Sequence, residues 1–215
     1  MREKGSAAGG AFLFYYGMVK NIIFDYGNVL VHWNPAPVYN DYFRNPEACA
    51  EFMAVLEQFG FHNRVDGGEK VDTVMAEFVA EYPQYEAPIQ YYKTRWNEML
   101  PDEIPGMRAL LAELVSGDRF EVFGLTNWTM ENFPIAYDRF EILRMIDRVV
   151  ISGKEFMIKP EERIFRLLLD RYRLIPEECL FVDDRAANVE AARKTGMQAH
   201  QFESAEKLRK ALALL

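Results

Sequence analysis

The chain has few of the residues that build disulfide frameworks and zinc sites. Its 215 residues include only two cysteines, Cys49 and Cys179, and three histidines in separate regions of the sequence. Neither set has the close spacing of metal-ligand motifs, and two distant cysteines do not make a disulfide scaffold. We therefore expect a protein of the reducing cytoplasm without a zinc cluster.

Long apolar runs and an excess of basic charge are also missing. Apolar runs such as residues 11–16 and 22–24 are far shorter than the roughly 20 residues that cross a bilayer. The 25 basic residues are outnumbered by 33 acidic ones, which gives a net charge of −8, and neither sign forms a long block. Because non-specific binding to nucleic acid needs a basic face, we expect neither a membrane nor a nucleic acid as partner. No oligomeric state is predicted.

Half of the residues are apolar, so the chain can bury a full core as one large domain or as one domain with an insertion. The first segment, residues 1–17, has charged and small residues and then only about six apolar ones, too few for a signal-peptide core. We interpret residues 1–17 as a leader or extension, with Met18 as a candidate start.

Short apolar segments alternate with amphipathic ones in the second half of the chain. A first buried strand ends in Asp25, and further strands are predicted at 119–127, 147–152, 178–184 and 197–202. Amphipathic helices are predicted at 105–117, 159–173, 186–196 and 204–215. Strands that alternate with helices imply a parallel sheet covered on both faces.

The region between Asp25 and about residue 104 has a helical pattern instead. Apolar residues recur every three or four positions in 45–61 and 69–83, with glycine and proline between these segments. We therefore predict an α/β fold with a Rossmann-like parallel sheet core, residues 18–34 and 105–215. A helical cap, residues 35–104, is inserted after the first strand.

Polar side chains stand at the carboxyl ends of the predicted strands, where ligands gather in open parallel sheets. Three acids, a hydroxyl and amide pair, and one lysine at the start of a helix are expected to converge on this rim. The set is Asp25, Thr126, Asn127, Lys159, Asp183 and Asp184.

Carboxylates that share one rim repel each other unless positive charge lies among them. A magnesium ion, which takes carboxylates, a backbone carbonyl and waters as ligands, removes this repulsion. Lys159 and the Thr126 hydroxyl remain as anion binders, and this combination of groups suits phosphoryl oxygens.

The sequence contains no GxSxG motif and no cysteine at a strand end. Asp25 is then the candidate nucleophile, a carboxylate able to form an aspartyl phosphate. Gly27 would let the backbone approach closely, with its carbonyl facing the metal.

Four ordered segments, "FDYGNVLVHWNP", "GLTNW", "IKPEERIF" and "FVDDRAANVEAA", resemble the motifs of the haloacid dehalogenase-like hydrolase superfamily. The segment "PGMRALLAEL" resembles its usual helix before the second motif. The resemblance covers about residues 19–202, and the insert at 35–104 is similar to the helical cap of this superfamily.

The resemblance implies a role for each matching residue. Asp25 is the nucleophile, Thr126 and the Asn127 backbone bind phosphate, and Lys159 clamps the charge. Asp25, the Gly27 carbonyl and Asp184 hold Mg²⁺, with Asp183 in support directly or through water. Asn188 stands where many members have another acid. The implied activity is a Mg²⁺-dependent phosphatase for a small phosphorylated metabolite, such as a sugar phosphate.

The chain departs from the superfamily at Gly27. Most phosphatases of this kind place a second Asp two residues after the nucleophile, as acid and base. The "DxGN" variant resembles a subgroup that includes bacterial sugar-phosphate phosphatases. A missing general acid costs on the order of a hundredfold in rate, and leaving groups of low pKa would suffer least.

In the predicted cap, the polar segment 62–70 is read as a loop between helices. We predict that His62 and Arg64 bind substrate there, with packing or solvation as the alternative. The residues Tyr91, Tyr92 and Trp96 have helical spacing and are expected to pack the cap.

Two other functions stay open. One is a 2-haloacid dehalogenase, in which Asp25 attacks carbon without a metal, although the paired acids Asp183 and Asp184 argue against it. The other is a phosphate-ligand-binding protein that has lost turnover together with the second Asp.

Overall fold

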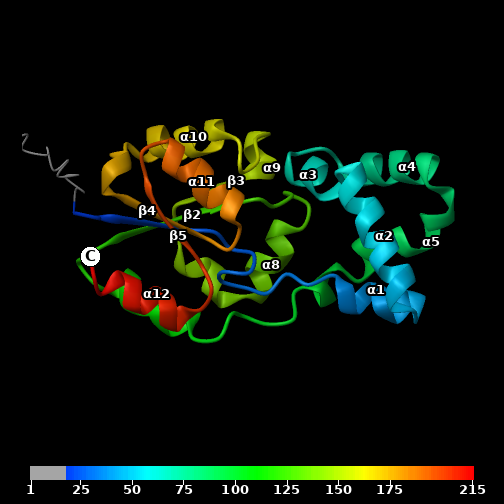
Figure 1. Cartoon of the computed structure of the whole chain (residues 1–215), viewed down its shortest axis with the longest axis horizontal. Helices are drawn as coiled ribbons and strands as arrows, with labels where there is room; N and C mark the ends of the chain where they lie inside the picture. Colours follow the sequence, from blue (N-terminus) through cyan, green and yellow to red (C-terminus); the bar gives the residue numbers. More distant parts are fainter. Residues whose placement is uncertain (1–17) are drawn as a thin grey trace, which may run out of the picture.

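A computed structural model describes residues 18–215, so the predicted leader, residues 1–17, lies outside the described part. Five parallel strands form one sheet in the order β3-β2-β1-β4-β5 (Figure 1). The strands are β1 (Asn21–Phe24), β2 (Glu121–Thr126), β3 (Val149–Ile151), β4 (Cys179–Asp183) and β5 (Gln198–Gln201). The predicted α/β fold with a parallel sheet is confirmed.

Helices cover both faces of the sheet, as the alternating pattern predicts. On one face, Ile23, Phe123 and Phe181 pack against α10 (Glu162–Tyr172) and α11 (Ala186–Lys194). On the other face, the alternate strand residues Ile22 and Phe24 belong to a core shared with three helices. These helices are α7 (Met107–Ser116), α8 (Phe133–Arg139) and α12 (Ala205–Leu212). Successive side chains of a strand point to opposite faces, which explains the two cores.

The sequence analysis did not predict α8. This helix has only seven residues and carries a proline in its first turn. Such a short segment shows too little apolar periodicity to be recognised.

A helical insert, residues 36–99, lies between β1 and β2 and extends beyond one end of the sheet (Figure 1). Its α-helices are α1 (Ala36–Phe43), α2 (Pro46–Phe59), α3 (Phe61–Asp66), α4 (Val71–Glu81), α5 (Glu86–Ile89) and α6 (Tyr91–Thr94). Two 3₁₀ turns follow α4 and α6, namely η1 (Pro83–Tyr85) and η2 (Trp96–Met99).

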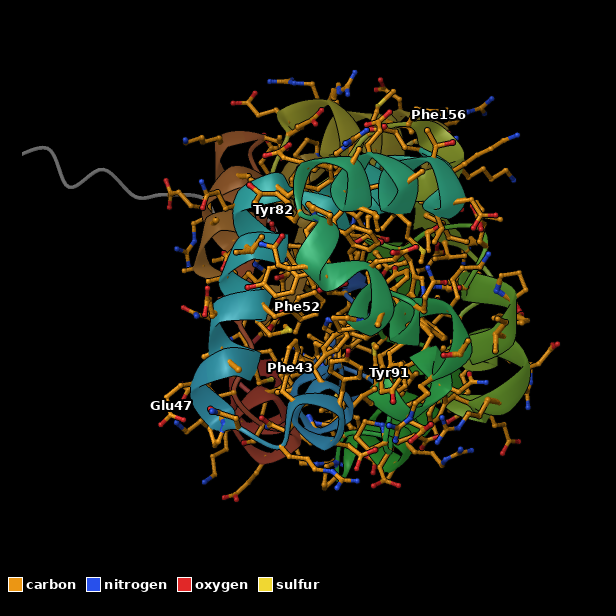
Figure 2. The ribbon with its side chains drawn as sticks, turned by 90° about the vertical axis from the view of Figure 1, so that its right-hand side faces the viewer. Phe43, Glu47, Phe52, Tyr82, Tyr91 and Phe156 are labelled. Carbon is orange, nitrogen blue, oxygen red and sulfur yellow. The ribbon has the colours of Figure 1, made fainter. Side chains whose placement is uncertain are left out.

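Local signals set the ends of the longest insert helix, α2. The Asn45 side chain accepts hydrogen bonds from the backbone N–H groups of Glu47 and Ala48, and Gly60 ends the helix with a positive φ. Phe52 of α2 is fully buried, whereas Glu47 is exposed and points outward in Figure 2. The insert therefore has its own apolar interior.

The segment 62–70 is not the loop that the sequence analysis predicted. Residues Phe61–Asp66 form the helix α3, and only the following glycines, Gly67 and Gly68, make a turn. A single apolar pair, Phe61 and Val65, is buried at the spacing of one helical turn. One such pair among polar residues is too weak a pattern to predict a helix.

Two connecting segments join the insert to the sheet, and these segments run side by side. The His32 N–H donates to the Asp102 carbonyl at 2.9 Å, and the Ile104 N–H donates to the Leu30 carbonyl at 2.8 Å. The proposed domain boundaries, 34/35 and 104/105, fall at this paired connection; the division into core and cap stays a prediction. Within residues 18–215, no helix combines the length and the apolar character needed to cross a membrane.

Candidate active site

Strand register places Asp25 beside the acids of β4. Phe24 pairs with Gly124 of β2 and with Val182 of β4. The residues that follow these three in the sequence therefore lie side by side across the sheet. The Asp25 N–H continues the ladder by donating to the Val182 carbonyl at 2.9 Å. Asp25 and Asp183 are therefore neighbours, although the sequence separates them widely.

Lys159 joins the two acids. Its buried ammonium lies 2.7 Å from Asp25 Oδ1 and 2.7 Å from Asp183 Oδ2, and it also donates to the Leu125 carbonyl at 3.0 Å. Burial acts to lower the pKa of Lys159, but the two carboxylates outweigh it and raise that pKa. All three ammonium protons are thus engaged, and the side chain stays charged.

Asp183 is the most strongly bound of the acids. Besides Lys159, it accepts from the Arg185 backbone N–H at 2.8 Å and from Asn188 Nδ2 at 2.9 and 3.0 Å. Burial acts to raise its pKa, but Lys159 and these donors hold the pKa below its usual value. Asp183 is therefore ionised, and Asn188 supports it as a donor where the superfamily pattern has an acid.

Asp25 and Asp184 have fewer hydrogen-bond and ion-pair partners than Asp183. Burial raises the pKa of Asp25, against the effect of Lys159, and Asp183 adds to the rise. Burial and the charge of Asp183 also raise the pKa of Asp184, whose Oδ2 lies 3.5 Å from Asn28 Nδ2. The Tyr26 N–H and Lys159 both bind Oδ1 of Asp25, whereas Oδ2 accepts no hydrogen bond from residues 18–215; Asp25 lines the cavity described below.

This set of groups fits a divalent cation. Asp25, Asp183 and Asp184 each offer an oxygen within 4.8 Å of the others. Lys159 balances only one of the three negative charges, so two remain when all three acids are ionised. An ion such as Mg²⁺, with its preference for oxygen ligands, matches both the charge and the chemistry of these groups.

Gly27 lies in the wall of the same site, and the predicted contact of its carbonyl with a metal stays a prediction. A Cβ built at Gly27 meets no described atom within 4 Å. Close approach of other protein groups therefore does not explain this glycine.

A cavity of about 690 Å³ lies over these acids, between the sheet and the insert. Its base contains Asp25, Lys159 and Asp184, and its apolar walls contain Trp33 and Trp96. Further insert residues in the lining include Met53, Glu57, His62, Asp66, Tyr92 and Leu100. The cavity has room for a phosphate ester with a small organic group.

His62 lies in this cavity wall. Its Nε2 is buried without a hydrogen-bond partner among residues 18–215, and burial lowers the pKa of the imidazole to about 4. The Trp33 ring lies 5.9 Å from the His62 ring, nearly perpendicular to it. The position of His62 is compatible with the predicted contact to substrate, with a neutral imidazole.

Arg64 is not in the lining of this cavity, so its position does not support the predicted role in substrate binding, which stays a prediction. Its guanidinium binds Glu69 at 2.5 Å and Glu77 at 2.6 Å, and lies 5.2 Å from the centre of the Phe59 ring. Two residues of a helix are about 200° of rotation, so a helix that turns His62 toward the cavity turns Arg64 away.

Asn127 has a function that the sequence analysis missed. Its Nδ2 donates to the Lys159 carbonyl at 2.9 Å, and its Oδ1 accepts from the Lys159 N–H at 2.8 Å. The side chain thus positions the lysine, while Asn127 also lines the cavity. Thr126 ends β2 and is 1% exposed, and it is not part of the cavity lining; its predicted role in phosphate binding stays a prediction.

Asn28 and Asp66 also line the cavity and were not assigned roles. For Asn28, the signal was its place directly after Gly27, where a left-handed φ of 56° suits asparagine. For Asp66, no sequence signal links residue 66 to the sheet.

The structure thus defines an α/β protein with an acidic cluster and a buried lysine at the carboxyl end of its parallel sheet. The sequence model of the haloacid dehalogenase-like hydrolases matches residues 52–201. The chain therefore belongs to the haloacid dehalogenase-like hydrolase family.

Curated relatives differ in how much of their length the chain spans. A phosphorylated carbohydrates phosphatase of Thermotoga maritima is 24% identical over 182 residues, which is 82% of each protein. A flavin mononucleotide hydrolase of Arabidopsis thaliana is 29% identical over 110 residues, 51% of this chain and 44% of the relative. Drimenol cyclase drtB of Aspergillus calidoustus is 24% identical over 91% of this chain, which is only 36% of that relative.

Solved structures share the fold at low identity. A family enzyme of Bacteroides thetaiotaomicron, crystallised with magnesium and inorganic phosphate, has a TM-score of 0.67 and 20% identity over 86% of this chain and 95% of its own. A predicted hydrolase of Porphyromonas gingivalis has a TM-score of 0.68 and 21% identity over 92% and 97% of the two chains.

Proposed function

We propose that the protein is a Mg²⁺-dependent phosphatase for a small phosphorylated metabolite, such as a sugar phosphate. The observation that carries the proposal is Asp25, which Lys159 holds by one oxygen and whose other oxygen accepts no hydrogen bond from residues 18–215, in the lining of a cavity of about 690 Å³. The phosphatase of Thermotoga maritima and the magnesium and phosphate complex of the Bacteroides enzyme support it.

In the proposed reaction, Oδ2 of Asp25 attacks phosphorus and the bond to the leaving oxygen breaks, which gives an aspartyl phosphate. Lys159 and the Thr126 hydroxyl bind the phosphoryl oxygens. Asp25, the Gly27 carbonyl and Asp184 would hold Mg²⁺, with Asp183 in support. The bound ion would neutralise charge on the phosphoryl group. Water then hydrolyses the intermediate and restores Asp25.

The charges of the site favour this function over a dehalogenase. Attack on carbon by Asp25 alone requires neither Asp184 nor a cation, whereas the three acids leave two negative charges beyond Lys159. A retained nucleophile, clamped by a buried lysine, also disfavours a protein that only binds phosphate.

The test is Asp25→Asn, which keeps the shape of the side chain and removes the nucleophile. With an aryl phosphate and Mg²⁺, we expect kcat to fall at least about 10³-fold. Hydrolysis at the wild-type rate would refute the mechanism. A screen of phosphorylated metabolites, with Mg²⁺ present and then chelated, identifies the substrate, and halide release from 2-haloacids would instead favour the dehalogenase.

A further inference from the structure

The proposed phosphatase lacks an obvious source for one proton. When the bond to phosphorus breaks, the leaving oxygen of an alkyl ester needs a proton, and Gly27 cannot supply it. Within the described part of the chain, the cavity lining contains two acids outside the candidate metal site, Glu57 and Asp66. Glu57 is exposed on α2, whereas Asp66 is partly buried at the end of α3.

Asp66 is tied to the sheet although it belongs to the insert. Its carbonyl accepts a hydrogen bond from Ser152 Oγ at 2.6 Å, and the same Oγ accepts from the Trp128 N–H at 2.8 Å. Trp128 directly follows Asn127, whose side chain holds Lys159 beside Asp25. A short chain of contacts thus connects Asp66 to the residues around the nucleophile.

Close packing fixes this end of α3 on α9 (Ser152–Glu155). Gly68 has a φ of +97°, and a Cβ built there would lie 2.6 Å from the Phe156 ring and 2.9 Å from the Gly153 carbonyl oxygen. Gly67 is similarly tight, because its Cβ would lie 2.9 Å from the Asn63 carbonyl oxygen. Gly68 thus lets the end of α3 approach α9 closely, and Asp66 at this end lies in the cavity lining.

The surroundings of Asp66 suit proton transfer at neutral pH. Burial raises the pKa of its carboxyl to about 7, while the Thr129 backbone, Lys159 and Arg185 oppose the rise. Tyr92 faces it from the insert, and the neutral His62 lies one turn earlier on α3. A carboxyl with a pKa near the working pH can both donate and accept a proton.

We propose that Asp66, supplied by the insert, is the acid–base residue of this site in place of the second Asp that Gly27 replaces. As Asp25 attacks phosphorus, the leaving oxygen takes the bonding electron pair and a proton from the Asp66 carboxyl. The Asp66 carboxylate then takes a proton from the water that attacks the phosphoryl group on Asp25. The bond from phosphorus to Asp25 breaks, and phosphate leaves with Asp66 protonated again. This inference rests on the proposed phosphatase function.

The test compares leaving groups in Asp66→Asn. An alkyl phosphate needs the acid, so we expect its kcat to fall about 10²-fold or more. Nitrophenyl phosphate has a leaving group that departs without a proton. We expect it to give a stoichiometric burst of nitrophenolate followed by slow turnover, because only hydrolysis of the intermediate then lacks its base. A merely structural defect would slow both substrates alike and give no burst.

Two further variants make the test specific. Glu47→Gln removes an exposed insert carboxyl that is not in the cavity lining, and we expect it to change neither substrate by more than about twofold. Gly27→Asp combined with Asp66→Asn should restore alkyl phosphate hydrolysis, because a side chain at residue 27 has open space.

The pH profile of the wild-type protein is an independent test, because it requires no variant. The kcat for the alkyl phosphate should fall above about pH 7 as Asp66 loses its proton, and the burst rate with nitrophenyl phosphate should not. Equal profiles, or equal losses in Asp66→Asn, would overturn the role of Asp66. If the wild-type protein hydrolyses neither ester with Mg²⁺, the proposed function itself fails.

Discussion

Lys159 sets the charge of the site at the scale of single residues. It contacts two carboxylates, but Asp183 has three additional hydrogen bonds from Arg185 and Asn188, whereas Asp25 has only one, from the Tyr26 N–H. Asp183 therefore holds its negative charge more firmly, and Asp25 keeps one oxygen without a donor. This difference gives two chemically identical side chains the separate roles of anchor and candidate nucleophile.

His62 gives a pH prediction at the same scale. Burial lowers its pKa to about 4 in the folded chain from an ordinary value of 6.5, so between these values the unfolded chain binds the extra proton. The stability that the neutral imidazole provides is complete above pH 6.5 and is lost as the pH falls toward 4, by at most about 1.4 kcal/mol per pH unit.

In His62→Phe this dependence should disappear. The measurement is the difference between the free energies of unfolding of wild type and variant, determined with urea from pH 7 to pH 4. As the pH falls, wild type should lose more of this free energy than the variant. Other titrating groups are common to both proteins and cancel in the difference. A difference that stays constant with pH would mean that His62 is not buried in its neutral form.

At the scale of elements, the loop after β2 and the short helix α9 meet without spare room. A Cβ on Gly153 of α9 would lie 2.7 Å from the Trp128 carbonyl oxygen and 3.0 Å from the Met130 nitrogen. The same helix carries Ser152, which binds both Trp128 and Asp66. The spacing between these two elements thus determines where the end of α3 lies over the cavity.

Gly153→Ala should therefore separate α9 from the loop after β2. We expect a loss of about 1–3 kcal/mol in the free energy of unfolding, together with a lower kcat because α3 moves with α9. The matched control is Gly27→Ala, where a Cβ meets nothing within 4 Å, and its stability should stay within about 0.5 kcal/mol of wild type. Equal stabilities of the two variants would contradict this account of the packing.

At the scale of the whole molecule, the acids and the cavity lie between the sheet and the insert, which are joined by the paired connection. Loops at the carboxyl end of the sheet supply Asp25, Asp184 and Lys159, and the insert supplies the opposite wall. An insert that moved about residues 30–36 and 100–106 would open and close the cavity, as lids do in other enzymes. Structures with and without a phosphate analogue would reveal this movement.

Mg²⁺ should stabilise the folded molecule, because binding to the native state alone adds about 2.7 kcal/mol at an ion concentration one hundred times the Kd. A chelator should lower the Tm and abolish hydrolysis, and added Mg²⁺ should restore both. In Asp184→Asn the shift of Tm with Mg²⁺ should vanish. The control Glu190→Gln changes an exposed acid of α11 and should keep the shift. A Tm that does not depend on Mg²⁺ in wild type would contradict the candidate metal site.

The alternating strands and helices of the sequence were sufficient to predict the sheet and the rim. Parallel strands have their carboxyl ends at one edge, so residues at or directly after these ends, such as Asp25, Asp183 and Asp184, are brought to the same edge of the sheet. Lys159 was predicted by the same reasoning, because it was expected at the start of the helix that follows the third strand. The helical character of the insert was also readable, because α2 and α4 are long enough to show apolar periodicity.

The sequence by itself thus determined the fold class and the acidic cluster with its lysine. Only the tertiary structure decided which insert residues reach that cluster. Whether His62 and Asp66 or Arg64 face the cavity depends on the rotation of a six-residue helix, and its docking depends on contacts with α9, distant in the sequence. Local patterns record the period of an element, but the orientation of a short helix is set by the surfaces between which it packs.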